Sequence, residues 1–158
     1  MTQQYPHQWV RDRLPHRWPF LLVDKVTKIT KNSIEGYKNV SASDVAFLGH
    51  FSEVSIMPGV FVVETLAQIS GLLLISKQEE TDQNQERGYV NTKVGLLTSI
   101  RGFKFLKIIE PGDRLSLKSI LKGGNENCFI FAVSAYVDDH EVAVGEIQIF
   151  LQEREVVM

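Results

Sequence analysis

Three residues in the middle of the chain combine a base, an acid and a backbone donor at short spacing. His50 lies in a stretch without regular periodicity, and Gly59 and Glu64 follow it at the start of an apolar segment. A histidine can take up a proton near neutral pH, and a carboxyl group can supply one. The free N–H groups of a helix N-terminus can bind an oxygen that gains negative charge. Together these groups could abstract a proton beside a carbonyl and expel a hydroxyl group.

Each of these side chains also has an ordinary structural explanation. A histidine in a loop can be hydrogen-bonded at the surface, and a glutamate on an apolar helix can be held by a buried partner. Gln68 lies four residues after Glu64 on the same helix face and could be that partner. The residue types alone therefore leave a catalytic and a structural interpretation open. A metal site is less supported, because the four histidines show no ligand spacing and the single cysteine stands alone.

The segment that carries Glu64 predicts a buried helix over residues 59–76. Pro58 precedes it and suits a helix start, where a missing N–H costs nothing. Glu64 is the only charge within these residues, and nearly every face is apolar. A helix that is apolar all round belongs in a core, covered by other elements or by a partner subunit.

The flanking segments predict antiparallel strands. Residues 20–31 and 33–40 predict a hairpin with its turn near Asn32, and residues 41–58 predict a long ordered loop. The second half predicts a run of four strands separated by polar turns, at 94–109, 114–122, 128–137 and 142–152. One buried helix with such a run of strands predicts an α+β fold in which the sheet covers the helix.

Length and composition predict one globular domain. The 158 residues favour a single core, which we place at about residues 13–152, with a polar exposed loop or frayed helix end at 77–87. A net charge of −2 argues against binding nucleic acid through bulk charge. Cys128 is the only cysteine, and the N-terminal residues lack the apolar core of a signal peptide. With no predicted transmembrane helix, a cytoplasmic protein is the simplest interpretation.

Three blocks of the sequence resemble one enzyme family. They are LPHRWPFLLVDKV at 14–26, GHFSEVSIMPGVFVVETLAQ at 49–68 and FKFLKIIEPGDRL at 103–115. In this order the chain resembles the 3-hydroxyacyl-acyl-carrier-protein dehydratases of the FabZ type, which have the hot-dog fold. The middle block is the most specific, because a histidine, a Met-Pro-Gly and a glutamate rarely coincide at fixed offsets.

The resemblance implies a role for each of the three residues. His50 matches the catalytic histidine, Glu64 the catalytic acid and Gly59 the glycine whose N–H binds the thioester carbonyl. The implied reaction converts a 3-hydroxyacyl thioester into a trans-2-enoyl thioester, in fatty-acid or related polyketide or polyene synthesis, without a cofactor. In such enzymes one site takes its His and Glu from two subunits, so the resemblance implies at least a homodimer, often a trimer of dimers.

The implied partner is an acidic acyl carrier protein. Residues 101–118 carry five basic side chains against two acidic ones, so a local basic patch could attract such a partner. The basic residues are Arg101, Lys104, Lys107, Arg114 and Lys118.

Some positions depart from the family pattern and leave other functions open. Ser52–Glu53 and Ser55 stand where the family commonly has Pro-Gly and Pro, which should loosen the loop that carries His50. Trp18 replaces a tyrosine, and Leu106–Lys107 replaces two arginines. The alternatives are a hot-dog acyl thioesterase, which would release a free thiol, and a non-catalytic acyl-binding subunit, which would bind without turnover.

Overall fold

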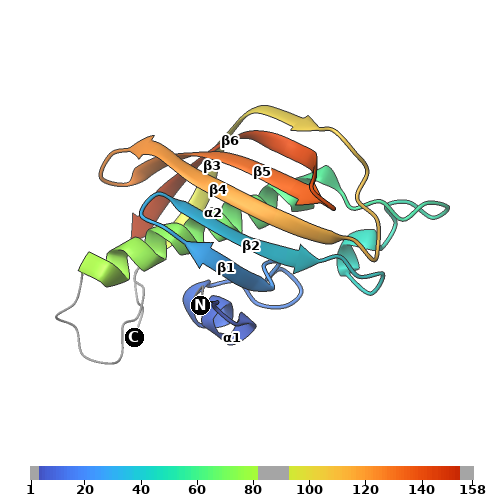
Figure 1. The fold of residues 1–158 in the computed structure, drawn as a ribbon, viewed down its shortest axis with the longest axis horizontal. Helices are drawn as coiled ribbons and strands as arrows, with labels where there is room; N and C mark the ends of the chain where they lie inside the picture. Colours follow the sequence, from blue (N-terminus) through green and yellow to red (C-terminus); the bar gives the residue numbers. More distant parts are fainter. Residues whose placement is uncertain (1–3, 82–92, 154–158) are drawn as a thin grey trace.

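A single antiparallel sheet wraps around one long helix (Figure 1). The computed structural model describes residues 4–81 and 93–153. Helix α2 spans Gly59–Thr81, and the short helices are α1 at His7–Arg13 and η1 at Val45–Phe47. The strands are β1 Lys25–Ile29, β2 Ser33–Asn39, β3 Lys93–Phe105, β4 Arg114–Gly124, β5 Cys128–Val137 and β6 His140–Glu153. Their order in the sheet is β1-β2-β4-β5-β6-β3, so the predicted α+β hot-dog architecture is confirmed.

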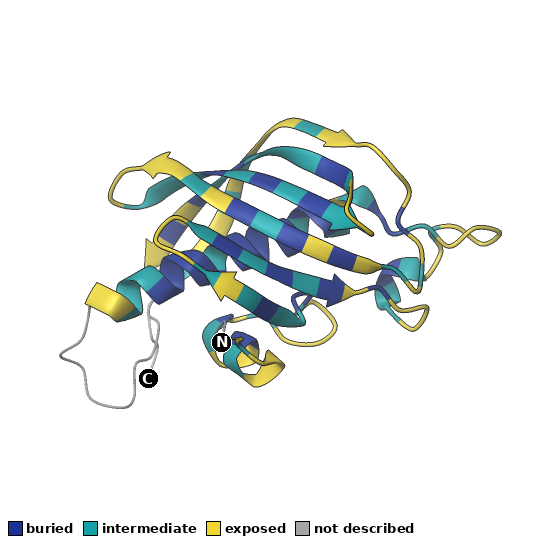
Figure 2. Ribbon diagram, viewed as in Figure 1, coloured by how far each residue is buried: buried dark blue, intermediate teal, exposed yellow. Residues whose placement is uncertain are grey.

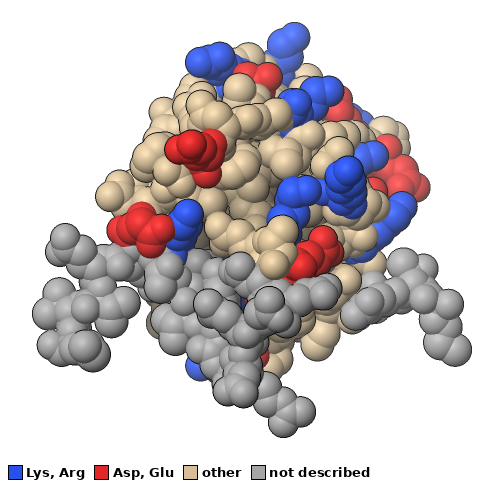
Figure 3. All heavy atoms as spheres, turned by 90° about the vertical axis from the view of Figure 1, so that its left-hand side faces the viewer, with Lys and Arg blue, Asp and Glu red and all other residues tan. Residues whose placement is uncertain are grey.

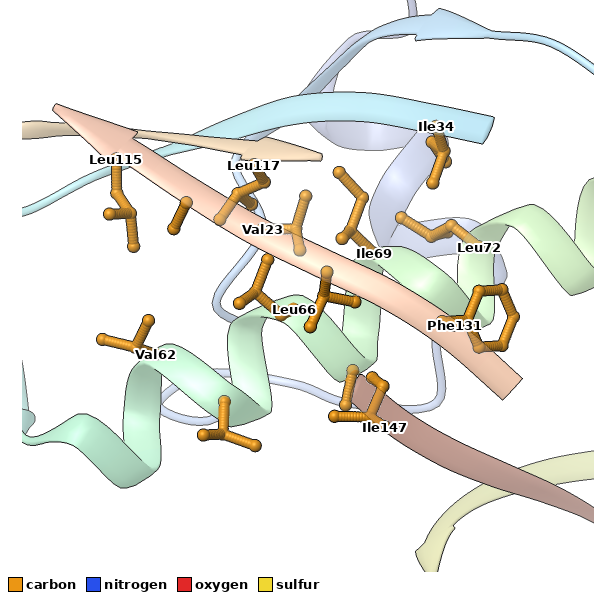
Figure 4. Packing of buried hydrophobic residues seen from close by; sticks show 14 of the residues in the cluster. Val23, Ile34, Val62, Leu66, Ile69, Leu72, Leu115, Leu117, Phe131 and Ile147 are labelled. Carbon is orange, nitrogen blue, oxygen red and sulfur yellow. The ribbon is translucent and has the colours of Figure 1, made fainter. Parts of the chain in front are cut away.

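Helix α2 forms the centre of the hydrophobic core. Val62, Leu66 and Ile69 face Leu117 and Phe131 of the sheet, as the close view shows (Figure 4). The helix has the length and hydropathy of a membrane span, but 67% of its most apolar window is buried within the protein. That burial identifies α2 as a core helix, as its all-round apolar sequence predicted.

Buried and more exposed residues alternate along β4 and β5 (Figure 2), as expected where successive side chains point to opposite faces of a sheet. In β4, for example, Leu115 and Leu117 are buried, whereas Arg114 is exposed on the opposite face. A buried hydrogen bond of 2.6 Å between the hydroxyls of Ser70 in α2 and Ser119 in β4 ties the helix to the sheet. Every second residue of these strands faces the helix, and the helix is apolar, so sheet and helix together form one core.

The predicted hairpin is confirmed, but its first strand begins later than predicted. β1 starts at Lys25, and residues 20–24 form no strand. The backbone there is bound elsewhere, because Leu22 N–H donates to the Gln68 side chain and the Phe20 carbonyl accepts from it. A glutamine from the helix therefore takes the place of a neighbouring strand.

Other elements also differ from the sequence-based prediction: β3 ends at Phe105 rather than at residue 109, and β6 begins at His140 rather than at residue 142. Helix α2 continues through residues 77–81, so this part of the polar segment is a helix end, one of its two predicted forms. Residues 82–87 of that segment lie outside the described residues. Residues 123–124 belong to β4 rather than to a turn. Helix α1 was not predicted, since seven residues with one buried side chain give little periodic signal.

Candidate active site

His50 is held by its own loop with one ring nitrogen directed at a backbone carbonyl. Its Nδ1 lies 2.8 Å from the Ile56 carbonyl oxygen, and its ring stacks on Phe51 at 4.1 Å between centroids. A carbonyl oxygen can only accept a hydrogen bond, so Nδ1 carries the proton. In the neutral ring Nε2 then has the free lone pair, which is the form that a general base requires.

The loop is closed by backbone hydrogen bonds although it lacks the family's prolines. Phe51 N–H donates to Val54 O at 2.8 Å, and Ile56 N–H donates to His50 O at 3.3 Å. Met57 N–H then donates to Ile109 O at 2.8 Å, which anchors the loop to the segment after β3. These bonds fix both ends of the stretch in which serine and glutamate replace proline and glycine.

The N-terminus of α2 lies in the same cleft as His50. The N–H groups of Gly59 and Val60 belong to the first helical turn, where no intrahelical acceptor exists. The cleft that His50 and these two residues line has a volume of about 640 Å³. Its other walls are mostly apolar side chains of α2, of the loop before it, of β3 and of the segment after β3, with Lys107 as a charged residue. His50 and the N-terminus of α2 therefore line the same cleft.

Gly59 is closely covered by an aromatic ring in this cleft. A Cβ atom built at Gly59 would come within 2.8 Å of the Phe105 ring. Phe105, at the end of β3, is 53% exposed and lines the cleft. The Phe105 ring thus occupies the space that a side chain at position 59 would need, and Phe105 was not predicted as part of the site.

Glu64 lies in a second cleft, apart from His50. Its neighbours there are His16, Ala67 and Gly71, and Glu64 does not line the cleft that contains His50. Gln68 Nε2 donates to Glu64 Oε1 at 3.0 Å, and His16 Nε2 lies 3.5 Å from the same oxygen. The Glu64 side chain is 21% exposed and lines the cleft while these two side chains hold it.

Gln68 connects Glu64 to the segment before β1. Its side chain is 2% exposed, and it accepts a hydrogen bond from Leu22 N–H at 2.9 Å. Its Nε2 donates to Phe20 O at 2.7 Å as well as to Glu64. The predicted pairing with Glu64 is confirmed, and the bonds to residues 46 and 48 positions away were invisible in the sequence.

The predicted basic patch does not form one surface. Arg101 and Lys104 lie on β3, whereas Arg114 and Lys118 lie on β4, and β5 and β6 separate these strands. Arg114 stacks on the Tyr37 ring at 3.5 Å from its centroid. Only Lys107 lines the His50 cleft.

The end of the molecule opposite the His50 loop carries mixed charge. There Lys and Arg side chains lie among Asp and Glu (Figure 3). Within residues 4–81 and 93–153, no three His, Cys, Asp or Glu side chains are grouped so that they could share a metal ion.

Comparisons with known proteins match almost the whole chain. A FabA-like domain matches residues 14–146. The 3-hydroxyacyl-acyl-carrier-protein dehydratase FabZ of Acinetobacter baumannii is 42% identical over 148 residues, which cover 94% of this chain and 97% of that protein. The dehydratase of the same name from Campylobacter jejuni is 38% identical over 92% of this chain and 96% of its own length.

Solved structures share the fold at lower sequence identity. The dehydratase heterocomplex ApeI:P from Xenorhabdus doucetiae matches with a TM-score of 0.76 at 19% identity, covering 91% of both chains. A hypothetical thioesterase from Streptococcus pneumoniae matches with a TM-score of 0.57 at 17% identity, over 82% of this chain and 87% of that one. The structures support the fold, and the sequence matches decide the family. The chain therefore belongs to the FabA-like family, among the FabZ-type 3-hydroxyacyl-acyl-carrier-protein dehydratases.

Proposed function

We propose that this protein dehydrates (3R)-hydroxyacyl-acyl-carrier-protein to trans-2-enoyl-acyl-carrier-protein in fatty-acid synthesis. The observation that carries the proposal is the position of His50, whose Nε2 is left as a base beside the free N-terminus of α2. The relatives that are 38–42% identical are named for this reaction, which supports the same assignment.

Each group of the site has a defined step in this reaction. His50 Nε2 removes a proton from C2 of the acyl chain, and the electron pair moves toward the thioester carbonyl. The Gly59 N–H at the helix N-terminus binds the oxygen that gains charge. Glu64 donates a proton to the 3-hydroxyl group, which leaves as water while the C2–C3 double bond forms. His50 then releases the proton that it took from C2 to solvent, and Glu64 takes up a proton from solvent. Both residues return to their starting forms, and no other reactant is consumed.

The proposed site is completed by a second copy of the chain. His50 and Glu64 line different clefts within one chain, so one copy does not bring base and acid together. The edge strand β3 is 13 residues long, pairs with no described strand other than β6, and exposes Leu96, Ile100 and Phe105. A long apolar edge strand offers unpaired backbone groups to another chain. We place a homodimer contact there, with Glu64 of the partner subunit facing His50; a trimer of dimers could add further contacts.

The carrier protein is proposed to approach beside β3. Lys104 and Lys107 are exposed, and Lys107 lies at the cleft that contains His50. Reversing both charges to glutamate should weaken binding of an acidic carrier protein and increase KM, measured by titration and by turnover. The control is the same reversal at Lys28 and Lys122, exposed residues on β1 and β4. Equal effects of the two double variants would contradict this docking position. We place the protein in the cytoplasm, where its substrate carrier would be synthesised.

The reaction is tested by mass spectrometry of a carrier-bound 3-hydroxyacyl thioester. Wild type should remove one water, and His50→Ala and Glu64→Gln should each abolish this loss. A released carrier thiol would instead identify a thioesterase. Carrier binding without any change in substrate mass would identify a non-catalytic subunit.

Mixing the two inactive variants tests whether the site is shared. In a dimer with one subunit of each variant, one site contains both substitutions. The other site contains the native His50 of one subunit and the native Glu64 of the other. After subunit exchange, random pairing should restore about one quarter of wild-type activity, because half of the dimers carry one intact site of two. No recovery, with exchange verified by native mass spectrometry, would place His50 and Glu64 of one chain in the same site.

A further inference from the structure

Gly71 leaves an open space on one face of the core helix. No described heavy atom lies within 4 Å of the position where its Cβ would stand, apart from its own helix turn and neighbours. A glycine in the interior of a helix lowers stability relative to alanine. At position 71 the packing of the described residues does not require glycine, since the methyl group of an alanine would fit.

The open space belongs to the cleft that contains Glu64. Glu64, Ala67, Gly71 and Ile75 line it at spacings of three or four residues, so they lie on one helix face. On the sheet side the cleft is lined by Lys93, Gly95 and Leu97 of β3 and by Ile149 and Leu151 of β6. The cleft therefore begins at a carboxyl group and continues along α2 between mostly apolar walls, with Lys93 as a charged residue on the β3 side.

We infer that the missing side chain at Gly71 lets the enzyme accept acyl chains long enough to pass this position, and so helps to set its chain-length specificity. The inference rests on the proposed function, because Glu64 is taken to contact the 3-hydroxyl of the substrate. The rest of the acyl chain then extends from Glu64 toward Ile75. Without a side chain at position 71, the helix lets the chain pass toward Ile75, which also lines the cleft.

Helix geometry converts this arrangement into chain lengths. At about 1.5 Å per residue, Gly71 lies about 10 Å beyond Glu64 and Ile75 about 16 Å beyond it. An extended chain advances about 1.2 Å per bond, the value for a fully extended polypeptide backbone. Counted from C3, the acyl chain passes Gly71 near about carbon 11 and reaches Ile75 near about carbon 16.

A side chain at position 71 should therefore lower the activity on long acyl chains more than the activity on short ones. Leucine on a helix leans toward the N-terminal turn, so Gly71→Leu should obstruct the cleft from about carbon 8 to carbon 11. The ratio of kcat/KM for the C14 substrate to that for the C6 substrate should fall at least about tenfold. Each methylene group of the substrate that loses its apolar surroundings should lower kcat/KM by roughly a factor of four. Gly71→Ala should shift the ratio in the same direction by a smaller factor.

The matched control is Gly123→Leu in β4, an exposed glycine with no described atom within 4 Å of its Cβ position. This variant should leave the C14-to-C6 ratio unchanged. An unchanged ratio in folded Gly71→Leu and Gly71→Ala, including an equal loss at both chain lengths, would overturn the inference.

A binding experiment separates this inference from the proposed reaction. If wild type converts no 3-hydroxyacyl substrate, the proposed function fails, and the cleft is tested with saturated acyl-pantetheine thioesters of six and fourteen carbons. Weaker binding of only the longer thioester to Gly71→Leu would support the inference, and equal affinity ratios in variant and wild type would refute it.

Discussion

Replacing Gln68 by methionine should destabilise the fold and disturb Glu64 at the same time. Methionine has a similar length and fits an apolar site, but it cannot donate to Phe20 O and Glu64 or accept from Leu22 N–H. Leu22 is 4% exposed, so its amide would lose its acceptor in a place that water does not reach.

The magnitude follows from the burial of the three bonds. A buried amide left without a partner costs about 1–3 kcal/mol. The other two bonds are only partly buried, so water can replace Gln68 there, and each contributes about 0.5 kcal/mol. The sum is a loss of about 2–4 kcal/mol, which corresponds to a decrease in Tm of roughly 5–15 °C for a chain of this size.

The free energy of unfolding is measured by urea denaturation, with Gln78→Met on the same helix as the control. Because Glu64 also loses a hydrogen bond, Gln68→Met should lower kcat more than it raises KM under conditions where the protein is folded. A free energy of unfolding within about 0.5 kcal/mol of wild type would refute the role of these bonds.

Three further outcomes follow from particular contacts. Ser70→Ala leaves the fully buried Ser119 hydroxyl without its 2.6 Å partner and should cost about 1–3 kcal/mol, whereas the double change to alanine should cost less than the sum of the single changes. Gly71→Ala should stabilise the helix by about 0.5–1 kcal/mol in the same denaturation experiment, and a destabilised variant would show that a methyl group does not fit there. Leu96→Lys places like charges on the edge strand β3 and should weaken dimerisation at least about tenfold by analytical ultracentrifugation; an unchanged dimer would place the subunit contact elsewhere.

The sequence by itself determined the core helix, the hairpin and the run of antiparallel strands. These elements carry strong local signals, because an apolar helix with one charge and strands of alternating side chains each have a distinct period. It also indicated His50, Gly59 and Glu64, since residue types at short spacing can be compared directly with a family pattern. Their joint use in one reaction remains a proposal.

Contacts over long sequence separations decided the rest. Residues 20–24 were predicted as strand, but hydrogen bonds to Gln68, more than forty residues later, hold them outside the sheet. The five basic residues are close in sequence, yet two intervening strands divide them between separate parts of the sheet. Such pairings depend on strand order, which local periodicity does not encode.

The placement of the site was likewise decided by the tertiary structure. The sequence places Gly59 and Glu64 within two turns of one helix, but rotation around that helix directs them into different clefts. His16 approaches Glu64 from a segment 48 residues earlier, and Phe105 covers Gly59 from the end of β3. A sequence lists the chemical groups, whereas the packing of the sheet around α2 determines which of them meet.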